Sequence, residues 1–274
     1  ELWNGSTWSE QTELSEGHYA AGSGGTSTSA ITAGGQDSGP SSANTEIWNG
    51  SSWSETADLN TGRVELGGTG PSNTALLVFG GNPGPGLYAR TENFDGTSWT
   101  EVNDLSVARQ NMSSHIGSTT VALATGGHDA SDRTASTEEW GFTGLDPSST
   151  PAVGYSNAIV GQVYYNSTTG QFKSVADGGA PIGTWASVSN MNSARTGLAP
   201  AQAGTRTLSL AFGGETPGGN SALTESWNGS AWTETGDLNQ VRQSLAGAGT
   251  YTSALAFGGL VSTGTGETEE FNGT

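Results

Sequence analysis

The chain has 274 residues, a formal net charge of −18 and no cysteine. This length is enough for one large domain with a sizeable core, and the absence of cysteine excludes disulfides, thiolate nucleophiles and cysteine-ligated zinc. The negative charge disfavours nucleic acid and anionic membranes as partners. No apolar run approaches the roughly 20 residues that a membrane-spanning helix needs, so we expect no nucleic-acid partner and no membrane insertion.

A Gly-Gly doublet recurs along the chain at 34–35, 80–81, 126–127, 213–214 and 258–259, with spacings of 46, 46, 87 and 45 residues. A short apolar run leads into each doublet, as in residues 75–79 and 121–125. Self-similarity at a fixed period of this length indicates a repeat architecture. Each doublet therefore marks one structural unit.

Each unit carries the signals of four strands in the same order. A Gly-rich strand is followed by an apolar strand that ends at Gly-Gly, and a third strand begins with Thr-Glu and an aromatic residue. Asn-Gly or Asp-Gly, which favour hairpin turns, leads to a fourth strand that begins at a Trp. No stretch shows a sustained 3.6-residue apolar period, which predicts very little helix. The predicted fold class is all-β, a β-propeller of four-stranded blades in one domain over residues 1–274.

The repeat resembles the kelch repeat, in which a Gly-Gly doublet ends the second strand, an aromatic residue lies in the third and a Trp in the fourth. The residues that carry this resemblance are Gly80, Gly81, Phe94 and Trp99, then Gly35, Trp48 and Trp53, and Gly214, Trp227 and Trp232. The resemblance covers nearly the whole chain and implies a kelch-like propeller. It says little about function, because one fold hosts many functions.

The spacing of 87 indicates one blade that carries an insert. The blade begun at 137–140 has its aromatic residue at Trp140, and the partner Trp follows only at Trp185. The extra residues, 144–183, include a predicted hairpin with strands at 163–165 and 172–175. We expect this insert to emerge from the turn between the third and fourth strands.

The repeats and the phrase at 161–175 together resemble virion structural or tail-fibre-like proteins of marine tailed phages. That resemblance implies a non-enzymatic component of a phage appendage, either a fibre or a decoration. It also implies a place in the virion or on an extracellular surface, in an oligomeric assembly with other virion subunits. Host-surface glycans are the further partner class that it implies.

The closure of the ring has two interpretations. Five apolar strands favour five blades, with Trp8-Ser-Glu as the fourth strand of the last one. However, third-strand phrases occur both at residues 1–5 and at 269–273, and one of them is surplus in a closed ring of five. The alternative is a segment of a longer propeller.

One charged pair per unit recurs at fixed positions, with His18 in the Arg place of the first unit. One interpretation is a ring of cations for an anionic ligand, and the other is a structural Arg–carboxylate pair in each blade, which the fixed register favours. The residues concerned are Arg63, Arg109, Arg195 and Arg242, with Glu46, Glu92, Glu138 and Glu225.

Aromatic residues divide into two groups. Trp at a repeat position is predicted to pack between blades, with stacking on sugar rings as the alternative. The aromatic residues outside the repeat register are the better candidates for ligand binding: Tyr88, Tyr155, Tyr164, Tyr165 and Phe172.

Signals for catalysis are poor. The three His residues show no metal-ligand spacing, and the chain contains no nucleophile elbow and no phosphate-binding glycine motif. Asp129 and Asp132 beside His128 are either a cation site or a solvated loop. We therefore predict no catalytic residues, no metal site, no cofactor and no enzyme activity.

The loops between second and third strands differ most from unit to unit, which favours them as a recognition surface. We expect these loops to contact a host surface or another component of the particle. A carbohydrate-binding or cell-surface adhesion propeller is the second hypothesis, and a propeller hydrolase or lyase is the third. The loops are residues 36–45, 82–91, 128–137, 215–224 and 260–268.

Overall fold

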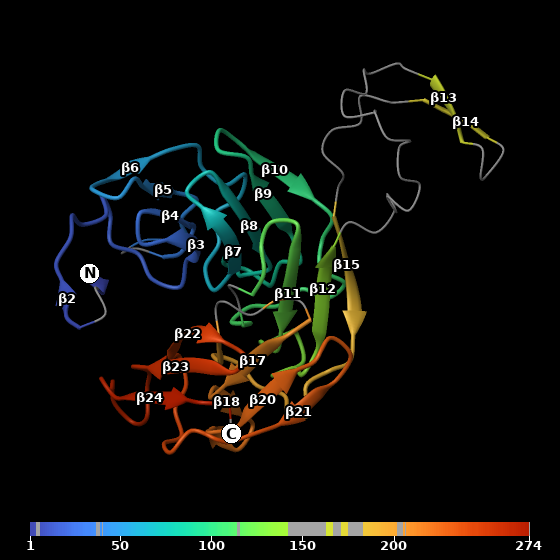
Figure 1. Ribbon diagram of the computed structural model, residues 1–274. Helices are drawn as coiled ribbons and strands as arrows, with labels where there is room; N and C mark the ends of the chain where they lie inside the picture. The colour runs from blue at the N-terminus through green and yellow to red at the C-terminus, as the bar shows by residue number, and fades with distance from the viewer. Residues whose placement is uncertain are drawn as a thin grey trace.

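The computed structural model describes residues 1–3, 6–36, 39, 41–113, 116–141, 163–166, 171–174, 183–201, 205 and 207–273. These residues form strands and no helix, and none of the described segments is an apolar helix of the length that crosses a membrane. Five antiparallel sheets follow one another around a central axis (Figure 1). The prediction of an all-β, five-bladed propeller is confirmed.

The blades follow the chain in order. The first blade contains β3 (Gly22–Thr26), β4 (Ser29–Ala33), β5 (Thr45–Trp48) and β6 (Trp53–Glu55), and the second contains β7 (Gly67–Ser72), β8 (Ala75–Phe79), β9 (Thr91–Phe94) and β10 (Trp99–Val102). The third blade contains β11 (Val121–Thr125), β12 (Thr137–Gly141) and β15 (Thr184–Val188), and the fourth contains β16 (Ala199–Pro200), β17 (Ser209–Phe212), β20 (Thr224–Trp227) and β21 (Trp232–Glu234). The fifth blade contains β22 (Ala246–Thr250), β23 (Ser253–Phe257) and β24 (Thr268–Phe271). A small hairpin of β18 (Glu215–Thr216) and β19 (Gly219–Asn220) lies within the 215–224 loop.

The third blade carries the insert between β12 and β15. These two strands pair with Trp140 opposite Trp185, although 44 positions separate the two residues in sequence. Within 144–183, β13 (Val163–Asn166) and β14 (Gln171–Ser174) pair where the sequence predicts a hairpin. The place of a first strand in this blade is taken by two isolated bridges, Ser113 with Thr125 and Gly117 with Ala122.

The core lies between the blades. Leu77 and Phe79 of the second blade pack against Ala122, Ala124 and Trp140 of the third, and all five side chains are buried. The same arrangement recurs at the other described interfaces. Within a blade, the third-strand aromatic residue lies against the fourth-strand Trp, with ring centroids 5.1 to 5.5 Å apart. A blade therefore depends on its neighbours to cover its apolar faces.

The second glycine of each of the first four doublets joins one blade to the next. The N–H of Gly81 donates to the carbonyl of Arg109, 2.9 Å away, in the linker that enters the third blade. Gly81 has a φ of +100°, and a Cβ there would lie 2.9 Å from the Cβ of Leu66. Glycine is required at this position because the backbone is left-handed and the neighbouring chain is in contact. Gly35, Gly127 and Gly214 make the equivalent bonds to Arg63, Arg195 and Arg242.

The N-terminal strands do not complete the last blade. β1 (Leu2–Trp3) pairs with β2 (Trp8–Ser9), with Trp3 opposite Trp8. Among the described strands, β24 pairs with β23 alone. The expectation that Trp8-Ser-Glu is the fourth strand of the last blade is therefore wrong. The reason is that β1 occupies the edge of β2 that β24 would need.

We expect the replacement of Gly81 by Ala to lower the free energy of unfolding by about 1–3 kcal/mol, because it combines a disfavoured φ with a clash against the Cβ of Leu66. The measurement is chemical denaturation followed by tryptophan fluorescence. Gly17→Ala is the control, since a Cβ at Gly17 meets nothing within 4 Å and its φ is ordinary. Equal midpoints for the two variants would contradict this account of the doublet.

Candidate functional site: the loop face of the propeller

The alternation of strand directions sorts the connections onto two sides of the propeller. The loops between second and third strands emerge on the same side as the linkers that enter each blade. We call this side the loop face. The turns between first and second strands and between third and fourth strands lie on the opposite side, the turn face, so the chain enters and leaves the 144–183 insert on the turn face.

A buried arginine closes the base of four of the five loops. Nη1 of Arg63 donates to the carbonyls of Gly80 and Arg90, at 3.2 and 2.7 Å, and these carbonyls flank the 82–91 loop. Nη2 donates to Oε1 of Glu92 at 2.9 Å. One side chain thereby holds the two ends of the loop and the strand that follows it. The equivalent groups are Gly126, Ser136 and Glu138 for Arg109; Gly213, Leu223 and Glu225 for Arg195; and Gly258, Glu267 and Glu269 for Arg242.

These guanidinium groups are shielded from solvent. The four Arg side chains are 0% exposed. Burial lowers the pKa of Arg63, while the charge of Glu92 raises it, and the same two opposing causes act on the pKa of Arg109 and Arg195. A guanidinium nevertheless stays protonated in proteins, so each of the four blades that has this arginine contains a buried ion pair. A ligand on the surface has no access to these cations.

The other carboxylate oxygen of each pair fixes the linker that enters the blade. Oε2 of Glu92 accepts from the N–H and side-chain amide of Asn60, and Oε2 of Glu138 accepts from the N–H of Ser106. Asn192 and Asn239 repeat the Asn60 contacts on Glu225 and Glu269. The carboxylate therefore ties the linker to the third strand of the same blade.

The first blade has a weaker version of this arrangement. His18 Nε2 lies 3.8 Å from Oε1 of Glu46, and neither ring nitrogen has a hydrogen-bond partner in the described part of the chain. Imidazole lacks the forked donors that reach two carbonyls at once. The base of the 36–45 loop is therefore not closed in the way that the other four are.

Neighbouring loops are joined to one another on the loop face. The hydroxyl of Ser41 donates to the carbonyl of Pro83 at 3.0 Å, which links the first two loops. Arg133 donates to Glu215 at 2.6 Å, which links the third and fourth, and this carboxylate raises the pKa of Arg133. Asn220 donates to the carbonyl of Leu260 at 2.9 Å, which links the fourth and fifth. The first two loops are thus joined to each other, and the third, fourth and fifth form a second joined group.

Two aromatic side chains are presented on this face. Tyr88, a predicted binding residue, is half-buried, and the guanidinium of Arg90 lies 5.0 Å from its ring centroid. Tyr19 is 62% exposed and donates its hydroxyl to Oε1 of Gln36 at 2.8 Å. The sequence analysis did not single out Tyr19. The available signal was its position directly after His18, where other units have Val64, Gln110, Thr196 or Gln243.

The remaining predicted binding residues lie in the insert. The structure shows backbone pairing of Tyr165 with Phe172 and of Tyr164 with Lys173. Tyr155 lies outside the described residues. The connection that carries the insert opens on the turn face, so the described structure does not bring these residues together with Tyr88.

The acidic residues near His128 have partners within their own loop. Oδ1 of Asp129 accepts from the N–H groups of Ser131 and Asp132, and Asp132 pairs with Arg133 at 3.0 Å. Backbone and Arg133 contacts lower the pKa of Asp132. Among the described residues, no three His, Asp or Glu side chains are grouped in a way that could hold a metal ion.

No protein-family model matches the chain, and no curated protein is similar to it. The chain is similar to a solved structure titled "Structure of YjhT", with a TM-score of 0.64 and 13% sequence identity. The similarity covers 92% of this chain and 80% of that chain. At this identity the likeness is one of fold. A propeller fold hosts both enzymes and binding proteins, so the function is argued from the loop face.

Removal of one partner from a buried ion pair leaves the other charge unpaired, at a cost of about 3–5 kcal/mol. We therefore expect Arg109→Ala to lower the free energy of unfolding by that amount. The double variant Arg109→Met with Glu138→Gln should lose less, since it leaves no unpaired charge and keeps an acceptor for Ser106. Chemical denaturation of the two proteins is the measurement.

The control is Glu101→Ala, because Glu101 pairs with Arg90 at 3.8 Å and its side chain is 51% exposed. Exposed pairs contribute about 1 kcal/mol at most. An unchanged stability of Arg109→Ala, together with altered ligand binding, would show that the arginine serves a ligand and not the fold.

Proposed function

We propose that this propeller is a non-enzymatic recognition and structural component of a phage virion appendage, which presents its loop face to a host surface or to another particle component. The arrangement of the loop face carries this proposal. A constant framework of buried Arg–Glu pairs supports four of the five loops, and all five loops differ in sequence. Binding surfaces are commonly built in this way, with variable loops on a rigid scaffold.

The sequence resemblance supports the choice of a virion appendage among the possible binding roles. Repeats of the TESWNGSAWTE type (224–234), together with the phrase at 161–175, are similar to virion structural and tail-fibre-like proteins. The net charge of −18 suits a protein displayed on a particle, since it maintains solubility. On this proposal the protein acts at the virion or extracellular surface, with other virion subunits as partners.

A carbohydrate-binding propeller is the second candidate, and the two tyrosines of the loop face favour it. Tyr19 and Tyr88 present aromatic rings of the kind on which sugars stack. Their neighbours Gln36 and Arg90 supply an amide and a guanidinium that can bond to sugar hydroxyls. The two candidates are compatible if the host receptor is a surface glycan.

Glycan-array binding by the purified protein tests the loop face. We expect Tyr88→Ala and Tyr19→Ala to weaken binding by roughly threefold to tenfold each, which is the range of one aromatic contact. Tyr251→Ala is the matched control, because Tyr251 is 38% exposed and lies in the turn between β22 and β23 on the turn face. Equal losses for all three variants would contradict recognition by the loop face, and turnover of a glycan would contradict the non-enzymatic role.

The insert is tested by replacing residues 144–183 with Asn-Gly-Ser, the turn that other units use. The third and fourth strands already pair in register, and lengthening a loop costs little entropy, so we expect cooperative unfolding with a nearly unchanged melting temperature. Incorporation into the assembly should fall, because a two-stranded hairpin is marginal alone and needs a surface to pack on. Unchanged incorporation would exclude an interface role for the insert, and an unfolded product would place it in the core.

A further inference from the structure

Four interfaces between consecutive blades are formed, and the gap between the fifth blade and the first lacks the same contacts. At each formed interface, the second glycine of a doublet donates to the next linker. A second bond joins linker to linker, as in Glu65 N–H to Ala20 carbonyl at 2.8 Å and Ser244 N–H to Gly197 carbonyl at 2.8 Å. In the described chain, the N–H of Gly259 and the carbonyl of Ser244 have no backbone partner. The carbonyl of His18 and the N–H of Ala20 have none either.

The apolar face of the fifth blade is uncovered on the same side. Leu255 is 41% exposed, whereas its repeat equivalents Ile31, Leu77, Leu123 and Leu210 are at most 1% exposed. Phe257 is half-buried, whereas the equivalent Phe79 is 0% exposed. One uncovered side, on the fifth blade, contains Leu255 and Gly259, and the other, on the first blade, contains His18 and Ala20. We call these two sides together the open interface.

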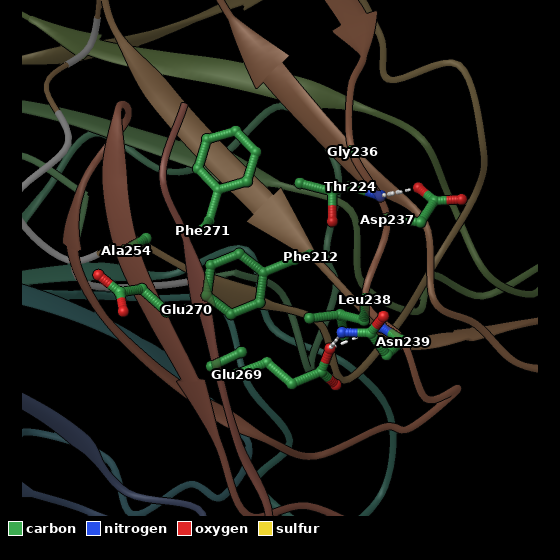
Figure 2. Close-up of a pocket in the computed structure, with 11 residues that line it drawn as sticks. Phe212, Thr224, Gly236, Asp237, Leu238, Asn239, Ala254, Glu269, Glu270 and Phe271 are labelled. Atoms are coloured by element: carbon green, nitrogen blue, oxygen red, sulfur yellow. Dashed lines mark hydrogen bonds between the residues drawn. The ribbon is translucent and has the colours of Figure 1, made fainter. Parts of the chain in front are cut away.

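A cavity between the fourth and fifth blades has the lining of a tryptophan site. Phe212, Thr224 and Phe271 line it (Figure 2). Their equivalents two interfaces earlier, between the second and third blades, are Phe79, Thr91 and Trp140, which surround Trp185. The Trp185 ring lies 4.9 Å from that of Phe79 and 5.5 Å from that of Trp140, and its Nε1–H donates to the hydroxyl of Thr91 at 3.0 Å.

The hydroxyl of Thr224 is the second sign of an indole site. Thr224 is 2% exposed, and its Oγ1 has no hydrogen-bond partner among the described residues. Trp232 Nε1–H donates to the equivalent hydroxyl of Thr137 at 3.2 Å. A buried hydroxyl without a partner is costly, and an indole N–H placed as those of Trp185 and Trp232 would satisfy it. At the first interface Trp99 donates instead to the carbonyl of Ala57, and the hydroxyl of Thr45 has no partner among the described residues.

The unpaired edge of β24 determines where a partner strand, and the indole that it carries, would be placed. In the complete blades the fourth-strand Trp lies opposite the third-strand aromatic residue, as Trp99 lies opposite Phe94. A strand added along β24 in this register places its Trp opposite Phe271, at the cavity. The partner therefore brings an extended Trp-Ser/Thr-Glu segment.

The hairpin of β1 and β2 shows what else the partner must bring. It has the register of the outer half of a blade, with Trp3 opposite Trp8 as Trp48 lies opposite Trp53. In Figure 1 it lies beside the first blade and apart from β22–β24. The linker after it is fixed to the first blade, since the N–H of Ser15 donates to Glu46 at 2.9 Å. This half-blade lacks the first and second strands that would lie next to β1.

We propose that the open interface binds one further repeat unit with the same sequence pattern as the units of this chain. Its Trp-bearing strand pairs with β24, and its indole enters the cavity of Thr224. Its linker supplies partners for Gly259 and Ser244, and its next two strands complete the blade of β1 and β2. Direct contact of the first and fifth blades would pair Gly259 with His18 and Ala20 with Ser244, in the pattern of the formed interfaces. It would leave β24 without a Trp-bearing strand and the cavity without an indole, because β1 occupies the edge of β2. A second copy of the chain brings the same occupied edge.

The test is to append residues 52–90 of this chain after Thr274, which places Trp53 of the added unit five residues beyond Phe271. Hydrogen exchange is followed by mass spectrometry on peptides that contain Gly259 and Ala20. We expect exchange at both to slow by roughly tenfold or more, because each gains a buried hydrogen bond. Changing the added Trp53 to Ala should remove most of the protection at Gly259, and appending residues 52–60 alone should leave Ala20 unprotected.

Three results would overturn the proposal. Strong protection of both amides in the unmodified chain at all concentrations would show direct closure of five blades. Protection that appears with rising concentration, together with a dimer by light scattering, would make a second copy the occupant. Unchanged exchange in a folded fusion protein would show that the open interface does not take a repeat unit.

Discussion

A sheet with two apolar faces is stable only between two others, and this constraint governs the whole molecule. Leu77 and Phe79 lie on one face of the second blade and Leu76 and Val78 on the other, and all four are 0% exposed. Neither face can be turned to water without loss of the hydrophobic stabilisation that the strand sequence encodes. The repeat therefore has to continue around an axis until each face is covered, and Leu255 marks where the described chain stops doing so.

The interfaces consist of contacts that do not vary with the loops. Glycine N–H donors, buried arginines and paired aromatic residues recur at the same repeat positions. The glycine and arginine contacts end on backbone carbonyls, which do not depend on the loop sequence. The guanidinium closes the base of a loop by bonding to carbonyls, so it imposes no condition on the side chains above it. The loop sequence is consequently free to change while its ends stay fixed, which separates the stability of the frame from the chemistry of the surface.

The features that were predictable from sequence are those that repeat. Gly-Gly spacing and Asn-Gly turns indicated the strands, the blade order and the propeller. Features that depend on a single departure from the repeat were not predictable in the same way. His18 stands in the arginine place, but only the structure shows that its ring reaches no carbonyl. Tyr19 carries no periodic signal, and its exposure depends on how Gln36 returns beside it.

The pairing partner of the N-terminal strand β2 was ambiguous in the sequence for a related reason. The phrases at residues 1–5 and 269–273 are nearly interchangeable, so the sequence supplies two candidates for the edge of β2. Proximity along the chain decides between them in favour of β1, because a short turn closes a hairpin at lower entropic cost than a contact across the ring.

On the functions proposed here, recognition and assembly would use different parts of the surface. The loop face carries the variable residues, the exposed Tyr19 and the half-buried Tyr88. The insert leaves from the turn face, and the open interface runs between the two faces along the blades. Contacts with an additional repeat unit would therefore cover Leu255 and the edge of β24 without covering Tyr88 or Arg90. Strand addition uses backbone groups and a buried indole, which give register and stability, whereas the loop face offers separate polar and aromatic groups suited to a ligand. A protein with this division can be incorporated into a larger structure through its sheet edges and still display a complete binding surface.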